Sequence, residues 1–178
     1  DRVHVLSGMF RGTTTGTPIA LVIYNTDSDS SKYETIKHLF RPGHADFTFF
    51  HKYAAHDYRG GGRSSGRETA ARVAGGAIAK KILAGRGVTI TAHTRELGGI
   101  TAEQVDYDEI ERNMIRCADP NAAAKMIAYI DRVRADEDSV GGIVQLDIRG
   151  LPPGLGDPVF AKLDAKLTYA IMTIGAIK

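Results

Sequence analysis

Short apolar runs alternate with amphipathic stretches along the whole chain. Four runs are rich in aliphatic or β-branched residues and short enough for strands. The second is so continuously apolar that we expect both of its faces to be covered. The predicted strands are residues 3–6, 18–24, 88–94 and 142–148.

The stretches between these runs carry helix signals. A short helix is expected over 30–38, before Arg41-Pro42, and a long one over 66–84, where Gly85 and Gly87 end it. The next starts are Asp106 and Asp119-Pro120, and Asp157-Pro158 is expected to open a last helix. Two apolar stripes are assigned to buried faces: Met126, Ile127, Ile130 and Val133, and then Phe160, Leu163, Leu167, Ala170, Ile171 and Ile174.

Alternating strands and helices predict an α/β (α+β) fold in layers, with helices covering sheets. The chain has 178 residues, 43% of them hydrophobic, which suffices for one domain with a core, and it shows no short repeat. We therefore expect residues 1–178 to form a single domain.

A glycine- and arginine-rich segment over 59–69 precedes the long helix. Gly60, Gly61 and Gly62 let the backbone approach a ligand, and Ser65 with Glu68 forms a capping box that would start the helix at Ser65. Free amides and the helix dipole at such a start favour a phosphate. The segment matches neither a Walker A loop nor a dinucleotide fingerprint, and a plain surface loop explains its composition equally well.

His44 lies between Pro42-Gly43 and Asp46. Proline and glycine favour a shaped turn, histidine exchanges protons near neutral pH, and the carboxylate of Asp46 could tune it. The remaining histidines are interpreted as surface or hydrogen-bonded structural groups: His4, His38, His51, His56 and His93.

These motifs occur together in one family. The chain resembles chorismate synthases, which carry an Arg-Pro-Gly-His-Ala-Asp segment, then Lys-Tyr, then a Gly/Arg loop ending Arg-Ser-Ser-Ala-Arg-Glu-Thr. The likeness extends over the whole chain and is weakest over 88–135. The matching segments are 16–20, 25–27, 41–46, 52–53, 57–69, 138–142, 150–160, 163–165 and 174–178.

The resemblance implies a β-α-β sandwich with internal pseudo-symmetry, assembled as a homotetramer. It implies anti-1,4-elimination of phosphate from 5-enolpyruvylshikimate 3-phosphate, giving chorismate, with reduced FMN as cofactor. Arg41 and Arg67 would contact substrate, and His44 would lie against the flavin as proton donor or charge stabiliser. The implied flavin contacts are Arg63, Ser64, Ser65, Gly175 and Ala176.

Three positions depart from the family pattern. Gly66 replaces the usual alanine, Ala54 stands where many members have glycine, and Gly175 occupies a site where a polar residue is common. The family's amino-terminal Gly-x-Ser-His-Gly segment and its carboxy-terminal portion have no counterpart here. We therefore expect an incomplete core of a longer enzyme, inactive by itself.

Other classes stay open. The chain could be a catalytically incomplete phosphate- or flavin-binding or assembly module, or a nucleotide-binding protein that reuses the glycine loop. The sequence does not say whether reduced FMN comes from a separate reductase or from an intrinsic NADPH-dependent activity.

Charge and cysteine content limit the classes of partner and the cellular compartment that we expect for this protein. A net charge of +2, spread evenly, argues against nucleic acid, and no apolar run reaches the roughly 18 residues of a membrane span. Cys117 is the lone cysteine, which excludes an intrachain disulfide and agrees with a reducing, cytoplasmic setting. The arginines near 41–72 form a local positive field suited to anionic ligands, and we expect a small anionic substrate and no metal.

Overall fold

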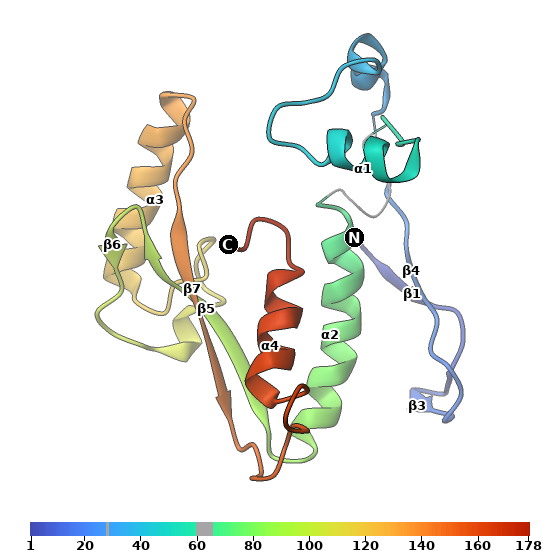
Figure 1. The fold of residues 1–178 in the computed structure, drawn as a ribbon. Helices are drawn as coiled ribbons and strands as arrows, with labels where there is room; N and C mark the ends of the chain where they lie inside the picture. Colours follow the sequence, from blue (N-terminus) through green and yellow to red (C-terminus); the bar gives the residue numbers. More distant parts are fainter. Residues whose placement is uncertain (28, 60–65) are drawn as a thin grey trace. The chain divides into compact units, whose positions relative to one another are not determined.

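A computed structural model describes residues 1–27, 29–59 and 66–178 (Figure 1). Its mixture of helices and strands confirms the predicted α/β class. The chain divides into two compact units, Asp1–Ala79 with Gly154–Lys178, and Lys80–Pro153. The single-domain organisation stays a prediction.

The strands of the first unit are short. β1 (Val3–Val5) pairs antiparallel with β4 (Leu21–Ile23), with Val3 opposite Ile23, and β2 (Met9–Phe10) pairs with β3 (Thr13–Thr14). β1 and β4 lie where strands were predicted. The expectation that the second predicted strand is covered on both faces is wrong for this chain, because all three residues of β4 are only half-buried.

The first unit contains a 3-10 helix, η1 (Ser31–Ile36), within the predicted short helix. It is followed by α1 (Asp46–Tyr53), which the sequence analysis does not predict. The α1 segment is rich in aromatic residues, which favour strands. It is helical here because Phe47 and Phe50, one turn apart, both pack against Phe40, with ring centroids at 5.5 and 5.6 Å.

α1 is capped at its C-terminus by Ala54, which has φ +56° and donates its N–H to Phe50 O at 2.7 Å. This left-handed conformation crowds the alanine Cβ, whereas glycine adopts it freely. The geometry thus gives a physical reason for the glycine that many members of the resembled family carry here.

Replacing Ala54 by glycine should therefore stabilise the protein. Relief of the left-handed strain outweighs the extra freedom of an unfolded glycine, and we expect a gain of about 0.5–1 kcal/mol. Urea unfolding of Ala54→Gly measures it, with Ala79→Gly, in the interior of a helix, as a control that should lose stability. Loss of stability in both variants would contradict the argument.

In the sequence, two helices flank the strands of the second unit's sheet: α2 (Glu68–Ala84) precedes them and α4 (Leu163–Met172) follows them. α2 confirms the predicted long helix, and α4 begins later than predicted. Asp157 and Ala161 exchange two backbone hydrogen bonds, at 2.8 and 2.9 Å, and this local pairing replaces the expected first turn. The predicted buried face is wrong in the same region, because Phe160 is 96% exposed.

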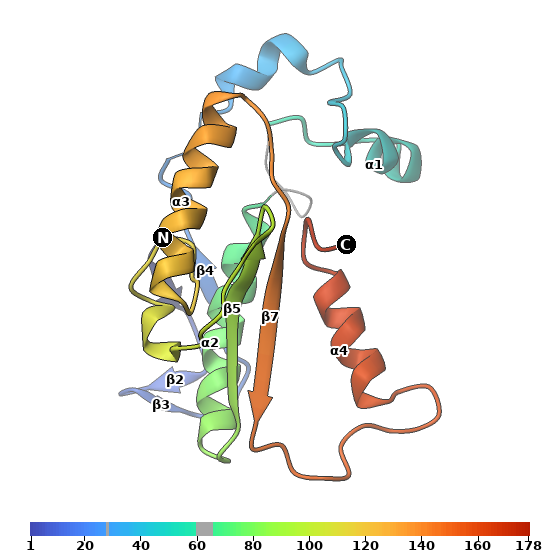
Figure 2. The same cartoon turned by 90° about the vertical axis from the view of Figure 1, so that its left-hand side faces the viewer.

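The second unit is built on an antiparallel sheet with strand order β6-β5-β7, and Figure 2 shows the two long strands β5 and β7 side by side. Its strands are β5 (Thr89–Leu97), β6 (Ile100–Thr101) and β7 (Gly142–Arg149). β5 and β7 pair along most of their length, with Ile90 opposite Ile148, and the register shifts between Thr94 and Glu96. Both long strands confirm their predictions.

The core of the second unit lies between this sheet and α3 (Pro120–Ala135). Asp119 begins α3 as predicted, because its carboxylate accepts the N–H groups of Asn121 and Ala122 at 2.9 and 3.1 Å. The predicted start at Asp106 gives only a short 3-10 helix, η2 (Tyr107–Glu109). The core cluster comprises Ala102, Cys117, Ala122, Ala123 and Met126.

The end of α2 is set by Gly87, as predicted. Gly87 has φ +75° and donates to Ala84 O at 3.0 Å, while Val88 donates to Leu83 O at 3.0 Å. This pair of bonds is a Schellman motif, which satisfies the last carbonyls of the helix. The chain therefore turns directly from α2 into β5.

His93 on β5 is the exception among the histidines. It is 1% exposed, and neither ring nitrogen has a hydrogen-bond partner among the described residues. Nδ1 lies 3.9 Å from Asp147 Oδ2, which accepts from Tyr107 Oη instead. The interpretation of His93 as a surface or hydrogen-bonded group is therefore wrong.

An unpaired buried imidazole costs stability, because its polar atoms lose water without gaining a partner. We expect His93→Leu to raise the free energy of unfolding by about 1 kcal/mol. Denaturant unfolding provides the value, and His51→Leu, at an exposed helical position, serves as the control. A clear loss of stability in His93→Leu would mean that the ring forms a bond that stabilises the fold.

Across the parts of the chain that the structure describes, none of the helices combines the length and the apolar character needed to cross a membrane.

Candidate functional site

The turn that carries His44 is built by its two preceding residues. His44 N–H donates to Arg41 O at 3.2 Å, and Gly43 has φ +69°. Proline at the second position and a left-handed glycine at the third define a type II turn. The sequence prediction of a shaped turn is confirmed, and the turn places Arg41 and His44 at its two ends.

Arg41 and Asp46 form a bidentate pair. Arg41 donates Nε–H to Asp46 Oδ2 at 2.8 Å and Nη2–H to Oδ1 at 3.0 Å. Asp46 is only 8% exposed, whereas about a third of the Arg41 side chain reaches solvent. The guanidinium also lies over the Tyr33 ring, 5.6 Å from its centroid. Arg41 is thus held from two sides in one orientation.

This pair fixes charge at the site. The hydrogen bonds from Arg41 lower the pKa of Asp46 from 3.8 to about 2, against the opposing effect of burial. The same bonds raise the pKa of Arg41. Both groups are therefore ionised at neutral pH.

His44 is oriented by the same carboxylate. Its Nδ1 lies 2.6 Å from Asp46 Oδ1, and the backbone nitrogen of Asp46 lies 3.2 Å from the same ring nitrogen. We assign the proton to Nδ1, because a lone pair there would repel the carboxylate at the shorter distance, so Nδ1 donates to Oδ1 and the backbone N–H is the weaker, competing contact. Arg41 Nη2 lies 3.1 Å from both ring nitrogens. Because Nδ1 carries a proton and the two nitrogens point in different directions in the ring plane, this contact is that of a cation beside the ring and not a hydrogen bond to both. Nε2 is then the nitrogen that can exchange a proton.

The pH dependence of the free energy of unfolding tests the cluster of Arg41, His44 and Asp46, because the pKa of Asp46 is lowered in the folded protein. A lowered pKa stabilises the fold above about pH 4, and the gain is lost as pH falls from about 5 towards 2. We expect Asp46→Asn to lose about 2 kcal/mol at pH 7 and to approach wild type near pH 2. Urea unfolding across this range measures the difference.

Asp57 offers the matched control for that experiment. It forms the same bidentate pair with Arg59, at 2.9 and 3.0 Å, but both side chains are largely exposed. Solvent screens such a pair, so Asp57→Asn should change stability much less. Equal losses in the two variants, or a loss in Asp46→Asn that does not depend on pH, would contradict the assigned geometry.

The residues that lead into the glycine-rich segment are tied to η1. Tyr58 Oη donates to Glu34 Oε1 at 2.8 Å, and Ser30 Oγ donates to Arg59 O at 3.3 Å. The predicted flavin contacts Arg63, Ser64 and Ser65, and the predicted capping box, lie outside the described residues. Gly66 is described, and a Cβ there would meet no atom within 4 Å, so alanine would fit equally well.

Arg67 lines a separate cavity in the first unit. It donates Nη1–H to Asp1 Oδ1 at 2.6 Å and Nη2–H to Tyr24 O at 3.2 Å. The cavity has a volume of about 420 Å³, within the size range of small-molecule sites. Its lining residues are Asp1, Val3, Ile23, Gly66, Arg67, Thr69, Ala70, Val73, Ala74 and Ala77.

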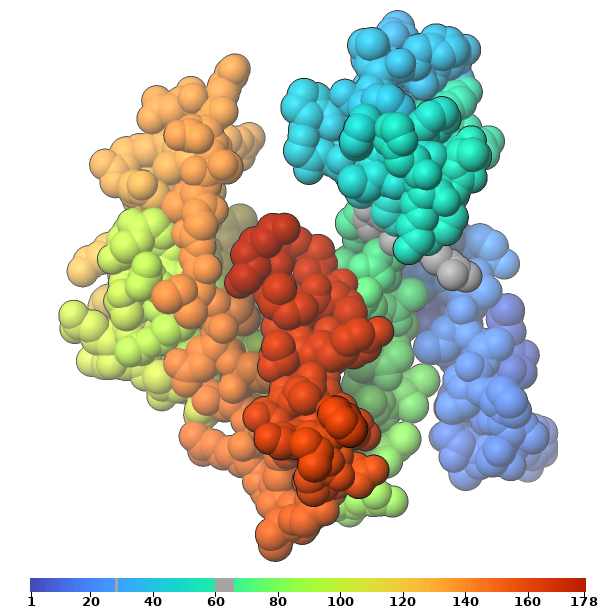
Figure 3. Space-filling model, in the orientation of Figure 1, coloured from blue at the N-terminus to red at the C-terminus, as the bar shows by residue number. Residues whose placement is uncertain are grey.

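Gly175 and Ala176 form a turn after α4, closed by Ile177 N–H to Ile174 O at 3.3 Å. Ala176 has φ +67°, and a Cβ on Gly175 would meet no atom within 4 Å. The turn is exposed, and its segment faces the viewer as the red end of the chain in Figure 3. The backbone of this turn is therefore open to a ligand.

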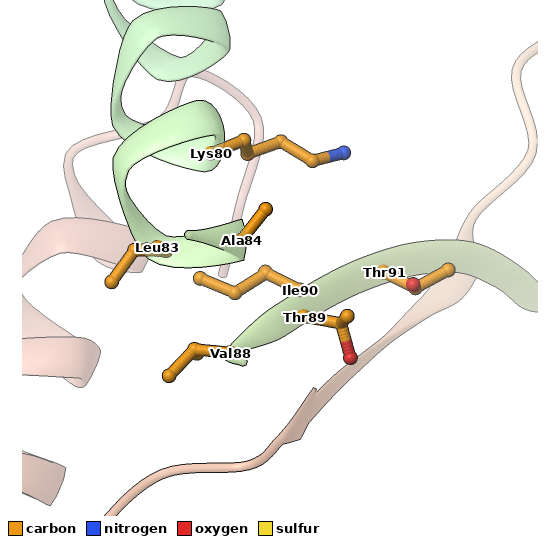
Figure 4. Close-up of a pocket in the computed structure, with 7 residues that line it drawn as sticks. All are labelled: Lys80, Leu83, Ala84, Val88, Thr89, Ile90 and Thr91. Atoms are coloured by element: carbon orange, nitrogen blue, oxygen red, sulfur yellow. The ribbon is translucent and has the colours of Figure 1, made fainter. Parts of the chain in front are cut away.

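A smaller cavity lies in the second unit, between the end of α2 and β5 (Figure 4). It measures about 220 Å³, and Lys80 is its one charged lining residue among the described part of the chain. None of the predicted site residues lines it. We interpret it as a packing gap above Ile90, because it is smaller than usual ligand pockets.

Some contacts that join distant segments leave no signal in the sequence. Tyr33 beneath Arg41, and Arg72 bonded to Thr173, are examples. Arg72 stands four residues after Glu68, a visible helical pair, but its partner 101 residues away carries no signal in the sequence.

Comparisons with known proteins agree with the resemblance. The family model described as chorismate synthase matches residues 1–178. A chorismate synthase of Chloroflexus aggregans is 56% identical over 178 residues, which are the whole chain and 49% of that relative. One of Methanococcoides burtonii is 52% identical over 182 aligned residues, covering the whole chain and 50% of that relative.

A crystal structure of chorismate synthase has a TM-score of 0.80 and 30% sequence identity, and it matches 99% of this chain and 53% of its own. This likeness confirms the predicted fold type. The chain spans about half the length of the relatives that it matches. On these matches, together with the Arg41, His44 and Asp46 arrangement, the chain belongs to the chorismate synthase family.

Proposed function

We propose that this chain supplies part of the active site that converts 5-enolpyruvylshikimate 3-phosphate to chorismate. The carrying observation is that one buried carboxylate, Asp46, fixes both an arginine and a histidine side by side. An anion-binding group next to a proton-exchanging group suits an elimination that releases phosphate and a proton.

The reaction balances without an external oxidant or reductant. The carbon–oxygen bond to phosphate breaks, and its electron pair leaves with phosphate. A ring carbon loses a proton, and that carbon–hydrogen pair enters the ring, where the existing double bond shifts and a second one forms. The protein must therefore stabilise the departing anion and manage one proton.

Arg41 is proposed to bind the anionic substrate. Asp46 occupies Nε and one side of Nη2, and Nη1 has no partner among the described residues. A guanidinium held by a carboxylate on one edge can present its other edge to an oxyanion. Asp46 therefore orients the guanidinium of Arg41 and leaves Nη1 available to bind the substrate.

His44 is proposed to hold or move a proton at Nε2. Asp46 fixes the tautomer by accepting from Nδ1, so Nε2 points away from the carboxylate. The cation of Arg41 beside the ring also keeps the local field positive. Both effects suit a residue that stabilises negative charge as phosphate leaves.

Reduced FMN is proposed as the cofactor, and when bound it supplies the electronic part of the elimination. The residues proposed to hold it are Arg63, Ser64, Ser65, Gly175 and Ala176. The described part of this set fits a flavin, because the 174–177 turn is exposed and open and the left-handed Ala176 is a strained position of the kind found at ligand sites. Arg67, at the start of α2, is proposed as a second substrate contact.

Assembly and location follow the family in this proposal. We infer a homotetramer in the cytoplasm, with NADPH as the ultimate reductant of the flavin. Apolar side chains are exposed on β7, among them Ile143 and Val144. Such a surface supports the proposal that another part of the assembly covers this strand. Light scattering on the family-length protein, meaning a polypeptide of the relatives' length that carries this sequence, would test the tetramer.

Flavin binding tests the proposed function. The family-length protein should bind reduced FMN in an anaerobic titration, more tightly when 5-enolpyruvylshikimate 3-phosphate is present. The 178-residue chain alone should form no chorismate. Binding of ATP or NADPH in place of FMN would contradict the proposal, and substrate-dependent FMN binding without any turnover would favour a binding module.

A further inference from the structure

Arg72 links two segments that are 101 residues apart in sequence. It lies one turn into α2 and donates Nε–H to both carboxylate oxygens of Glu68, at 2.8 and 3.0 Å. Its other two nitrogens reach Thr173, with Nη1 to Oγ1 at 2.7 Å and Nη2 to the carbonyl oxygen at 3.1 Å. All three guanidinium nitrogens are therefore engaged.

Thr173 is the residue at which α4 ends. Its hydroxyl donates to Ala170 O at 2.7 Å while accepting from Arg72. The carbonyl of Thr173 is one of those that a helix leaves without an internal partner, and a cation there also suits the helix dipole. The contact with Arg72 therefore fixes the end of α4 in the place where its backbone needs a donor.

One end of this link adjoins a proposed substrate contact, and the other end adjoins a proposed flavin contact. Glu68 begins α2, directly after Arg67, and Thr173 precedes the 174–177 turn with its left-handed Ala176. The planar guanidinium imposes one relative orientation on its partners, which a lysine ammonium would not do. The link can thus hold the two segments in register.

We propose that Arg72 is a positioning residue for the flavin, acting through Thr173 on the Gly175–Ala176 turn and through Glu68 on the start of α2. This inference rests on the proposed function, because it takes that turn to contact FMN. Arg72 itself is given no contact with substrate or cofactor.

The test uses the family-length protein under anaerobic conditions. Arg72→Gln should raise the Kd for reduced FMN about tenfold and change the visible spectrum of the bound flavin. Arg72→Lys should not restore either property. Thr173→Val should weaken binding about threefold, and Thr173→Ser, which keeps the hydroxyl, should restore it.

A double-variant experiment shows whether Arg72 and Thr173 act on FMN binding together or independently. If Arg72 acts through Thr173, the double variant Arg72→Gln with Thr173→Val should bind FMN about as weakly as Arg72→Gln alone. Arg112→Gln is the control, since Arg112 forms a comparable pair with Glu109 at 2.9 Å in the second unit. It should leave both Kd and spectrum unchanged.

Three results would overturn the inference alone. A Kd and spectrum in Arg72→Gln like those of wild type would do so, even if its melting temperature fell. Multiplicative losses in the double variant would show that the two residues act separately. If Arg72→Gln does not fold, wild-type binding by Thr173→Val has the same meaning. Absence of FMN binding by wild type would instead overturn the proposed function itself, and the inference with it.

Discussion

Replacing His44 by alanine should lower turnover by the family-length protein by about 10²- to 10⁴-fold, the usual contribution of a positioned proton-transfer group. Nε2 is lost, whereas the pair between Arg41 and Asp46 remains. Substrate binding should therefore change little. Steady-state measurement of chorismate formation would show the fall in kcat with a nearly constant KM.

His51 is the matched control for that variant. It lies on α1 near the cluster, and its ring packs on Phe47 with centroids 4.3 Å apart, but it has no proposed part in the reaction. His51→Ala should retain turnover. The melting temperature of His44→Ala should stay close to wild type, because about 30% of the His44 side chain is exposed and it fills no core position. Turnover of His44→Ala within a factor of ten of wild type would remove His44 from the mechanism.

The second large effect is expected at Arg41. Lysine keeps the charge but cannot donate two parallel bonds to Asp46 and present a further edge to the substrate. We expect Arg41→Lys to lower kcat/KM about a hundredfold, the value of one or two charge-assisted hydrogen bonds. Initial-rate kinetics at low substrate concentration measure it.

The stability of Arg41→Lys shows whether its loss of kcat/KM comes from the site or from a weakened fold. Lysine still compensates the buried charge of Asp46, so Arg41→Lys should unfold at a denaturant concentration close to that of wild type. Arg112→Lys, at a partly exposed ion pair of the second unit, should keep full activity. If Arg41→Lys retained wild-type kcat/KM, the bidentate geometry would have no role in substrate binding.

Local signals predicted much of the fold. Asp119 as a helix cap, Gly87 as a helix end and the Pro42-Gly43 turn all follow from one residue's backbone preference or one short side chain, and the structure confirms them. Such features depend on neighbours a few residues away. They are readable from the sequence because no distant contact competes with them.

The failures have longer-range causes. Asp157-Pro158 satisfies the rule for a helix start, yet the backbone pairs with Ala161 first and the helix begins at Leu163. α1 carries strand-favouring aromatic residues, but Phe40 stabilises it as a helix. In both cases a contact outside the local pattern decided the structure.

The candidate site divides in the same way. The turn composition indicated His44, the family likeness indicated Arg41 and strengthened His44, and their closeness to Asp46 follows from a turn of a few residues. The Tyr33 platform and the link from Arg72 to Thr173 depend on tertiary contacts, so no sequence pattern indicated them. The roles of Arg67, Gly175 and Ala176 stay predictions.

One measurement tests the central claim most directly. The family-length protein is incubated anaerobically with 5-enolpyruvylshikimate 3-phosphate and a small amount of reduced FMN, and phosphate and chorismate are quantified together. We predict equal amounts of the two products, many turnovers per flavin, and a loss of both products in His44→Ala. Binding of substrate and reduced FMN without release of phosphate would contradict the account.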